Sequence, residues 1–151
     1  MREFHRRNLP HLYYDEGQYF VTYRLSNSIP QSSLQELKNE FETKSKLTDI
    51  QQKRLFAKYD LLLDSNEFGI NYLKIKSISE IVKDTIEYPN GKEYKLICYC
   101  IMPNHVHLVF ELLKGNKGVS KIMQSIKRIS SRKANVELNH KGNFWQAESF
   151  D

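Results

Sequence analysis

Two apolar segments joined by a two-residue break constrain the fold of this chain most. EYKLICYCIM (residues 93–102) and HVHLVFEL (residues 105–112) are each long enough for a strand, and only Pro103 and Asn104 separate them. Strands joined so closely pair antiparallel, because a parallel crossover needs a dozen or more residues. The hairpin therefore predicts an antiparallel sheet at the centre of the protein.

The segments around this hairpin complete the expected order of elements. QYFVTYRL (residues 18–25) is aromatic and β-branched, which is typical of a strand. Ser28 is a candidate N-cap for a helix that runs to Phe41, and the apolar periodicity of residues 44–64 predicts a second helix. Ser77 and Glu80 fit a capping box at the start of a third helix.

The C-terminal half contains one more predicted helix and one extended segment. Apolar residues recur at helical spacing from 119 to about 138, and FWQAESF (residues 144–150) predicts a last strand or an extended tail. The order is then strand, helices, two strands, helix, strand. This order predicts an α+β ferredoxin-like sandwich with a central antiparallel sheet and additional helices inserted after the first strand.

Composition limits the class of protein and of partner. The 151 residues suit one domain, and 23 Lys and Arg against 18 Asp and Glu give a net charge of +5, which favours an anionic partner such as nucleic acid. No apolar segment is long enough to span a bilayer, and the N-terminus lacks the apolar core of a signal peptide. We therefore expect a cytoplasmic protein.

The hairpin carries two histidines one residue apart. Side chains alternate across a strand, so His105 and His107 project from the same face and could share one cation. Two imidazoles are an incomplete site, and a carboxylate, an amide or water would have to supply the other ligands. The alternative is that one or both histidines are hydrogen-bonded polar groups at a sheet edge.

Two cysteines on the neighbouring strand offer another kind of site. Cys98 and Cys100 also share a face, and if the turn pairs Met102 with His105, Cys100 lies opposite His107. A zinc site is then conceivable, but a flat hairpin wraps poorly around a tetrahedral ion. We interpret both cysteines as core residues.

The surroundings of the histidines add a family resemblance. MPNHVHLVF (residues 102–110) resembles the histidine–hydrophobic–histidine (HUH) motif of single-tyrosine transposases that act on single-stranded DNA, in particular the REP-associated tyrosine transposases. Three further blocks agree, and together they cover most of the chain: RRNLPHLYYDEGQYFVTYRL, SKIMQSIKRISSRKAN and GNFWQAESFD.

The resemblance implies a ferredoxin-like domain that uses a divalent metal, Mg or Mn. It makes His105 and His107 the metal ligands, and the ion polarises a phosphodiester of single-stranded DNA. A tyrosine then attacks that phosphodiester and forms a 5′-phosphotyrosine intermediate. The expected partner is single-stranded or hairpin DNA, and a homodimer stays open.

The family's nucleophilic tyrosine lies on a helix beyond the Trp-Gln block, where this sequence stops. All 9 tyrosines precede His105, at positions 13, 14, 19, 23, 59, 72, 88, 94 and 99. We therefore expect a single domain, 1–151, without the C-terminal helix. It would have no catalytic residue of its own, because the nucleophile lies beyond Asp151, and this chain alone would be inactive.

Three functions remain open at this point. The first is a transposase that cleaves and rejoins single-stranded DNA, or a fragment of one. The second is a catalytically inactive DNA-binding module derived from such an enzyme. The third is a small metal-binding structural protein without a DNA role.

Four residues are candidates for DNA contact. Lys121, Arg128 and Arg132 fall on one narrow stripe of the helix that starts at Val119, which is either a solvated charged face or a phosphate-contacting one. Trp145 is either a core or sheet-edge anchor or a platform for an unpaired base. RRNLPH (residues 6–11) is a further basic patch, or a tail that packs along the sheet.

Overall fold

The computed structural model contains the predicted hairpin at its centre. It describes residues 4–6, 10–12, 17–42, 46–65, 69–147 and 149. Strands β4 (Tyr94–Ile101) and β5 (His105–Leu112) pair antiparallel, and the turn between them closes when the Met102 N–H donates to the His105 carbonyl at 2.8 Å. This register places Cys100 opposite His107, as expected for a turn that pairs Met102 with His105.

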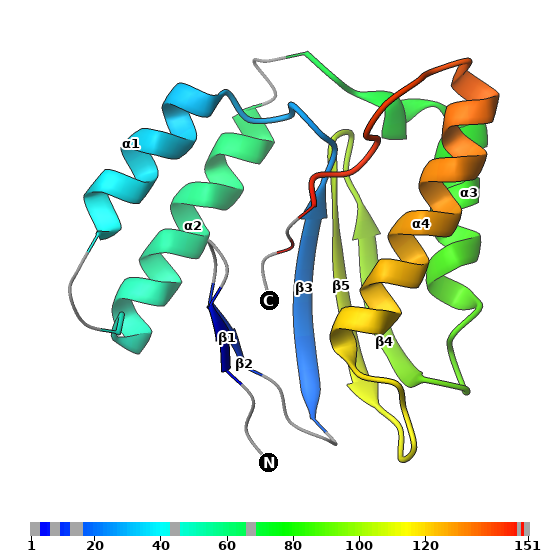
Figure 1. Cartoon of the computed structure of the whole chain (residues 1–151), viewed down its shortest axis with the longest axis horizontal. Coiled ribbons are helices and arrows are strands. Elements are labelled where there is room, and N and C mark those ends of the chain that lie inside the picture. Colours follow the sequence, from blue (N-terminus) through cyan, green and yellow to red (C-terminus); the bar gives the residue numbers. More distant parts are fainter. Residues whose placement is uncertain are drawn as a thin grey trace.

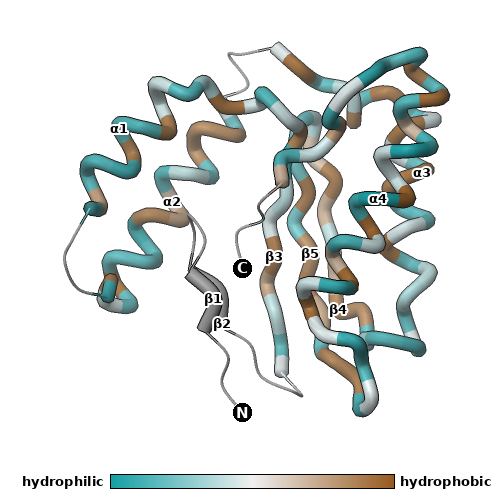
Figure 2. The backbone as a smooth tube through the Cα atoms, in the orientation of Figure 1, coloured by the Kyte–Doolittle hydropathy of each residue, from teal (hydrophilic) through white to brown (hydrophobic). Residues whose placement is uncertain are grey.

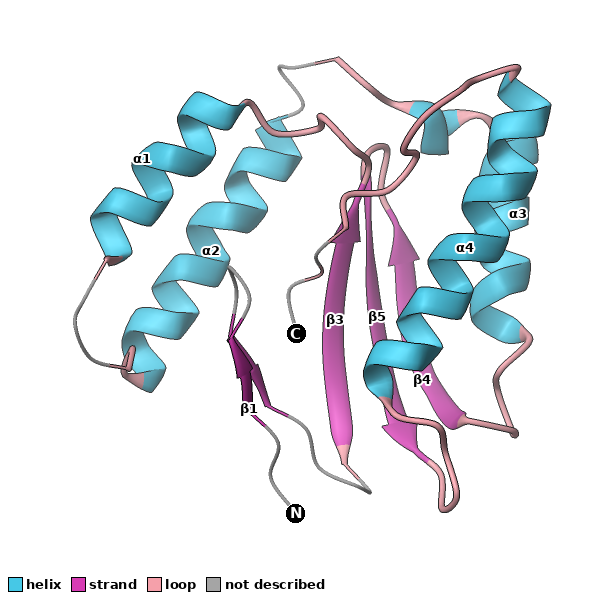
Figure 3. Cartoon of the chain, viewed as in Figure 1, coloured by secondary structure: helices cyan, strands magenta, loops and turns pink. Residues whose placement is uncertain are grey.

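Strand β3 (Gln18–Arg24) completes a three-stranded sheet in the order β3-β5-β4, in which each strand pairs antiparallel with its neighbour. Figure 3 shows these strands between helices on both sides. Helices α3 (Lys76–Glu87) and α4 (Val119–Leu138) lie on one side, and α1 (Gln31–Phe41) and α2 (Asp49–Ser65) on the other (Figure 1). The predicted α+β class, with helices inserted after the first strand of the central sheet, is confirmed.

The segment after α4 returns to the outer edge of β3. Trp145 forms an antiparallel bridge with Leu25, and the Gln146 N–H donates to the Arg24 carbonyl at 2.8 Å. This short pairing places the C-terminal segment where a fourth strand of a ferredoxin-like sheet would lie. Of the predicted strand over 144–150, only this bridge forms among the described residues.

The first residues form a small sheet that the sequence did not predict. Strands β1 (Phe4–Arg6) and β2 (Pro10–Leu12) pair antiparallel with each other (Figure 1). The side chains of the predicted basic patch over 6–11 lie outside the described residues.

The main core lies between the sheet and helices α3 and α4. Along β5, Val106, Leu108 and Phe110 are fully buried and point toward these helices. Apolar and hydrophilic residues alternate along α4, as the colours in Figure 2 show. An amphipathic helix against an alternating strand is the packing that the sequence pattern predicts. The helical residues of this core are Ile78, Val82, Ile86, Ile122, Met123 and Ile126.

Helices α1 and α2 form a second, smaller core. Its buried residues are Ile29, Leu37, Leu55, Tyr59 and Leu63. The apolar pattern over residues 44–64 predicted helix α2 but not the residue at which it starts. Thr48 and Gln51 form a reciprocal capping box, because the Thr48 N–H donates to Gln51 Oε1 and the Gln51 N–H donates to Thr48 Oγ1. This box starts α2 at Asp49.

The two predicted helix caps at serine are wrong. Helix α1 begins at Gln31 after Pro30, and Ser28 Oγ instead accepts a hydrogen bond from Arg24 Nη1 at 3.2 Å. Helix α3 begins at Lys76 after Ile75, and no side chain caps it, so the Ser77 capping box does not form. Ser28 does not cap α1 because its hydroxyl is hydrogen-bonded to the buried guanidinium of Arg24.

Candidate metal centre

Three ligand atoms converge on the face of the sheet that α2 covers. His107 Nε2 lies 3.2 Å from His105 Nε2 and 3.1 Å from Asp60 Oδ1, and His105 Nε2 lies 3.8 Å from the same oxygen. All three atoms lie within 4.8 Å of one another. The strand supplies the two imidazoles, as alternation predicted, and the inserted helix α2 supplies the carboxylate.

Hydrogen bonds behind the two rings fix which nitrogens face this point. His105 Nδ1 lies 2.6 Å from Asn104 Oδ1, and the Asn104 amide nitrogen donates to the Leu63 carbonyl at 3.0 Å. The amide oxygen is thereby left to accept, so His105 carries its proton on Nδ1 and a lone pair on Nε2. His107 Nδ1 lies 2.8 Å from Thr22 Oγ1, which supports its ring in the same way.

Burial keeps the His105 ring neutral. Its side chain is fully buried, and desolvation followed by the nearby His107 lowers the pKa of His105 from 6.5 to about 4, against an opposing effect of Asp64. A metal-ligating imidazole must be deprotonated, so this environment keeps Nε2 available at neutral pH.

The Asp60 carboxylate gives an independent indication that the cluster suits a cation. Among the described residues no donor hydrogen-bonds to its buried Oδ1, although His107 Nε2 is 3.1 Å away. A buried carboxylate oxygen without a donor is costly. Ligand atoms at right angles around an ion about 2.1 Å away are about 3.0 Å apart, close to the two spacings of 3.1 and 3.2 Å from His107 Nε2. The three residues therefore fit a divalent cation.

A second carboxylate stands one helical turn further along α2. Asp64 Oδ1 lies 3.7 Å from His105 Nε2, and its side chain is 46% exposed. Residues four apart share a face of a helix, so Asp60 and Asp64 both point toward the histidines. Asp64 is not part of the group of three residues whose ligand atoms all lie within 4.8 Å of one another.

Polar contacts hold α2 against the sheet at this point. Arg24 of β3 is buried, and its Nε donates to the Tyr59 hydroxyl at 2.9 Å. The bond from Asn104 to the Leu63 carbonyl makes a second connection. The carboxylate ligand is thus positioned by residues on both sides of it in the helix.

The cysteines take no part in this cluster. Cys98 and Cys100 are both exposed, so their interpretation as core residues is wrong. They lie on β4, which is at an edge of the sheet, and on the face opposite to the helices of the main core. A carboxylate from α2 gathers with the histidines instead of a thiol.

The predicted basic stripe lies on the other side of the molecule. Lys121, Arg128 and Arg132 are exposed on α4. Helix α4 packs on one face of the sheet, and the histidines project from the other (Figure 1). The sheet therefore separates these two sets of candidate residues.

Trp145 occupies the anchor position. Its side chain is buried, its Nε1–H donates to Ser130 Oγ at 2.8 Å, and its ring lies 4.7 Å from that of Tyr23. A stacked base would require the indole to leave this place. The DNA-contact role of Trp145 stays a prediction.

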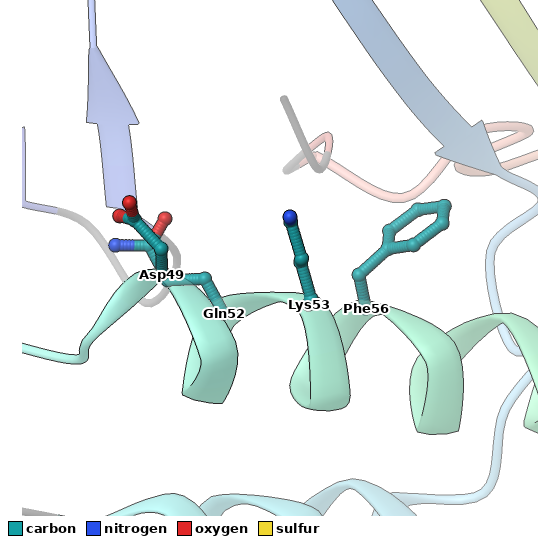
Figure 4. Close-up of a pocket in the computed structure, with 4 residues that line it drawn as sticks. All are labelled: Asp49, Gln52, Lys53 and Phe56. Atoms are coloured by element: carbon teal, nitrogen blue, oxygen red, sulfur yellow. The ribbon is translucent and has the colours of Figure 1, made fainter.

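A hollow of about 360 Å³ lies beside α2, toward its N-terminal end. Asp49, Gln52, Lys53 and Phe56 line it, and all four project from the same side of the helix (Figure 4). Asp60 lies one turn after Phe56 along α2, so it projects from the same helix face as the residues that line the hollow.

The sequence model of the family described as "Transposase IS200 like" matches residues 70–151. This chain belongs to the IS200-like transposase family. The resemblance read from the HUH motif is thereby confirmed at the level of the family.

Other comparisons give more distant likenesses. A solved REP-associated tyrosine transposase, bound to a REP hairpin, is similar to this chain with a TM-score of 0.47 and 14% sequence identity. The likeness covers 99% of this chain but 60% of that chain. No curated protein sequence matches. None of the described helices has the length and apolar character needed to cross a membrane.

Sequence reasoning did not identify Asp60, the carboxylate of the candidate metal centre in this transposase-family protein. Asp60 lies before residue 70, outside the segment that the family model matches. A signal was available: Asp60 and Asp64 are four apart in a predicted helix, a spacing that places two carboxylates on one face. Which strand that face would meet was a question of tertiary structure.

Proposed function

We propose that this chain is the metal-binding and DNA-binding part of a DNA transposase that acts as a single-strand endonuclease and transesterase of the HUH type. The observation that carries the proposal is the convergence of His105, His107 and Asp60 in a member of the IS200-like transposase family. The nucleophile would be a tyrosine outside these 151 residues.

The proposed ion is Mg²⁺ or Mn²⁺. Carboxylate and water ligands suit these ions, and three protein ligands leave coordination positions for a phosphate oxygen. When bound, such an ion neutralises charge on the scissile phosphate and orients the displacement. His105 and His107 would hold it through Nε2, and Asp60 through Oδ1.

The residues of this chain would hold and orient the DNA strand for the reaction. In the proposed displacement the tyrosine oxygen bonds to phosphorus, the bond from phosphorus to the 3′-oxygen breaks, and that oxygen leaves as a hydroxyl. The 5′-phosphotyrosine conserves the phosphodiester energy for rejoining. Thr22 and Asn104 would keep the two imidazoles in the ligating tautomer.

Lys121, Arg128 and Arg132 are proposed as phosphate contacts on a second surface. Because the sheet separates this stripe from the metal centre, both surfaces contact one DNA only if it extends around the molecule. A folded hairpin with an unpaired flank is a substrate of this kind. The physiological partner is therefore proposed to be single-stranded DNA with hairpin structure.

Metal titration tests the proposal directly. Mn²⁺ binding would be followed by the loss of free-ion electron paramagnetic resonance signal, with Mg²⁺ as competitor. We expect His105→Ala with His107→Ala to weaken binding at least about 100-fold, and Asp60→Asn at least about 10-fold, since even outer-shell partners carry effects of this size. Asp64→Asn is the matched control, with a smaller loss.

Two results would overturn the metal proposal. One is unchanged Mn²⁺ affinity in the double histidine variant. The other is global unfolding of that variant at 25 °C, seen by circular dichroism, which would indicate a structural role for the pair. Preference for Zn²⁺ with no measurable Mn²⁺ or Mg²⁺ binding would favour the structural metal protein.

The second candidate function is a catalytically inactive DNA-binding module. It is favoured by one observation, that all 9 tyrosines of this chain precede the metal-ligating histidines. Incubation with hairpin-containing single-stranded DNA and Mn²⁺ should give no covalent adduct with this chain alone. An adduct on a tyrosine of this chain would contradict both the module and the external nucleophile.

A further inference from the structure

We propose that Phe20, next to the metal centre, stacks on an unpaired nucleobase, and that Phe56 and Lys53 of α2 extend this contact along a single DNA strand. The inference rests on the proposed function and assigns residues that hold the substrate at the same site. All three residues lie before residue 70, outside the segment that the family model matches.

Phe20 is a partly exposed aromatic side chain beside the candidate metal centre. It is 42% exposed although it lies in the middle of β3. Its ring stacks on His107 with centroids 5.4 Å apart and planes 20° apart, and it forms a T-shaped contact with the Phe56 ring at a centroid distance of 5.3 Å. These neighbours hold the ring in one orientation while much of it stays open. A rigid, partly open aromatic ring is what a base-stacking platform requires.

Helix α2 lines up the rest of the contact. Positions 49, 53, 56 and 60 are spaced by four, three and four residues, so they share one face. Asp60 stands at the metal centre, Phe56 meets Phe20, and Lys53 lies seven residues from Asp60, about 10 Å along the helix axis. The order along this face is therefore a metal ligand, an aromatic ring and a cation. In the proposed complex the metal would bind one phosphate, the aromatic rings would contact the base, and Lys53 would contact the next phosphate of the strand.

The hollow beside α2 is the proposed binding site for this DNA strand. In Figure 4 the side chains of Lys53 and Phe56 project into the same space, with Asp49 and Gln52 beyond them. Its volume of about 360 Å³ falls in the range of small-ligand sites. The Asp49 carboxylate disfavours a phosphate at its own end and can accept from a base amino group. The phosphate is therefore assigned to the Lys53 side.

Single-stranded DNA fits this surface better than duplex DNA or a protein. Duplex bases are stacked on each other and offer no free face, whereas every unpaired base does. A protein partner would need a larger apolar area than one half-exposed ring beside a lysine and two polar side chains. The position of this surface on the same helix face as a metal centre that would bind a phosphate also favours the nucleic acid strand.

The test uses the whole chain and a single-stranded oligonucleotide that contains 2-aminopurine, whose fluorescence is quenched by stacking. We expect Phe20→Leu to weaken binding about 5- to 100-fold and to lose the quenching, because stacking contributes about 1–3 kcal/mol per base. Phe20→Trp should bind at least as tightly as wild type. Tyr88→Leu, which removes a 71% exposed aromatic on the far side, is the matched control and should change nothing.

Metal affinity separates a stacking role from a structural one. Mn²⁺ binding of Phe20→Leu should stay within about twofold of wild type, because leucine preserves the apolar packing against α2. A parallel loss of Mn²⁺ and DNA binding would show that Phe20 only positions His107, and would overturn the inference. Unchanged DNA binding and quenching would overturn it as well. So would a change in oligomeric state, measured by sedimentation, which would indicate a protein partner at this ring.

The contribution of Lys53 is measured by the salt dependence of DNA binding. Lys53→Ala should reduce the slope of log affinity against log salt by about 0.7, the value for one phosphate contact on a single strand. Lys76→Ala, the same charge change on α3, should leave the slope unchanged. If wild type itself binds single-stranded DNA without salt dependence, the DNA role in the proposed function fails. If wild type binds normally and only the Phe20 and Lys53 effects are missing, this inference alone fails.

Discussion

The two faces of the central sheet are built from the same three strands but differ in chemistry. On the face covered by α3 and α4, residues such as Val106, Leu108 and Phe110 are fully buried in an apolar core. On the face toward α2, buried positions are polar and include Arg24, Asn104 and His105. Neighbouring residues of one strand therefore serve different layers.

This difference explains how the fold can tolerate a site whose buried polar groups destabilise it. Burying polar groups is unfavourable unless each has a partner, and on the metal face the oxygen Asp60 Oδ1 has no donor within the part of the chain that the structure describes. Apolar burial on the opposite face supplies the stability that offsets this cost. Local inconsistency of this kind is expected at functional sites. The comparison predicts that stability and ligand binding respond to different sides of β5.

The largest expected effect is on stability, from the α3–α4 side. Phe110 is fully buried and stacks between Tyr94 at 4.6 Å and Tyr19 at 5.9 Å, so Phe110→Ala should cost about 3–5 kcal/mol of unfolding free energy in urea denaturation. Val109→Ala, on the other side of the same strand, is the matched control and should cost less than about 1.5 kcal/mol. An equal loss of unfolding free energy in the two variants would contradict the conclusion that stability depends mainly on the face covered by α3 and α4.

The next effect is the pH dependence of stability on the metal side. With chelator present, the unfolded chain protonates His105 near its ordinary pKa of 6.5, whereas the folded protein does so only near its pKa of about 4. Lowering the pH through this window therefore favours the unfolded state. Between pH 7 and pH 5 the loss should be about 2 kcal/mol, measured by urea denaturation.

The variant His105→Gln is the control for this pH dependence. Its unfolding free energy should change by about 2 kcal/mol less over the same pH interval, because glutamine does not titrate. Above about pH 7.5 the contribution of His105 should be constant, because the imidazole is then neutral in both states. A pH dependence that is the same in both proteins would place the titrating group elsewhere and would contradict a neutral, buried His105.

The smallest effect concerns the outer surface of α4. Replacement of Lys121, Arg128 and Arg132 by alanine should leave Mn²⁺ affinity unchanged and reduce the salt dependence of hairpin DNA binding by about 0.9 per duplex phosphate contact that is lost. Electrophoretic mobility shifts over a range of salt concentrations would measure it. An unchanged slope would show that the stripe is only a solvated face, and that DNA contacts are confined to the metal side.

Much of the fold could be predicted because its signals are local. The two apolar segments around Pro103 and Asn104 specified an antiparallel hairpin, and alternation placed His105 and His107 on one face. Helical periodicity identified the inserted helices and α4. The ends of helices were less predictable: hydroxyls at Ser28 and Ser77 looked like caps, but a buried arginine used the first and the second formed no cap.

Exposure of the cysteines was predicted wrongly for a related reason. Cys98 and Cys100 alternate with apolar residues in a way that is compatible with either face of the strand. Their strand lies at the edge of the sheet, and no pattern in the sequence showed which face the helices would cover. Burial at such positions depends on contacts from distant segments rather than on neighbouring residues.

The sequence by itself determined the hairpin, the shared face of the two histidines and the family resemblance, because each depends on residues close together in the chain. Only the tertiary structure decided that Asp60 joins the two histidines in the candidate metal centre, that Phe20 stands beside it, and that the α4 stripe lies behind the sheet. These relations join residues more than 30 positions apart. They depend on how α2 packs against the sheet, which side-chain spacing within one element does not encode.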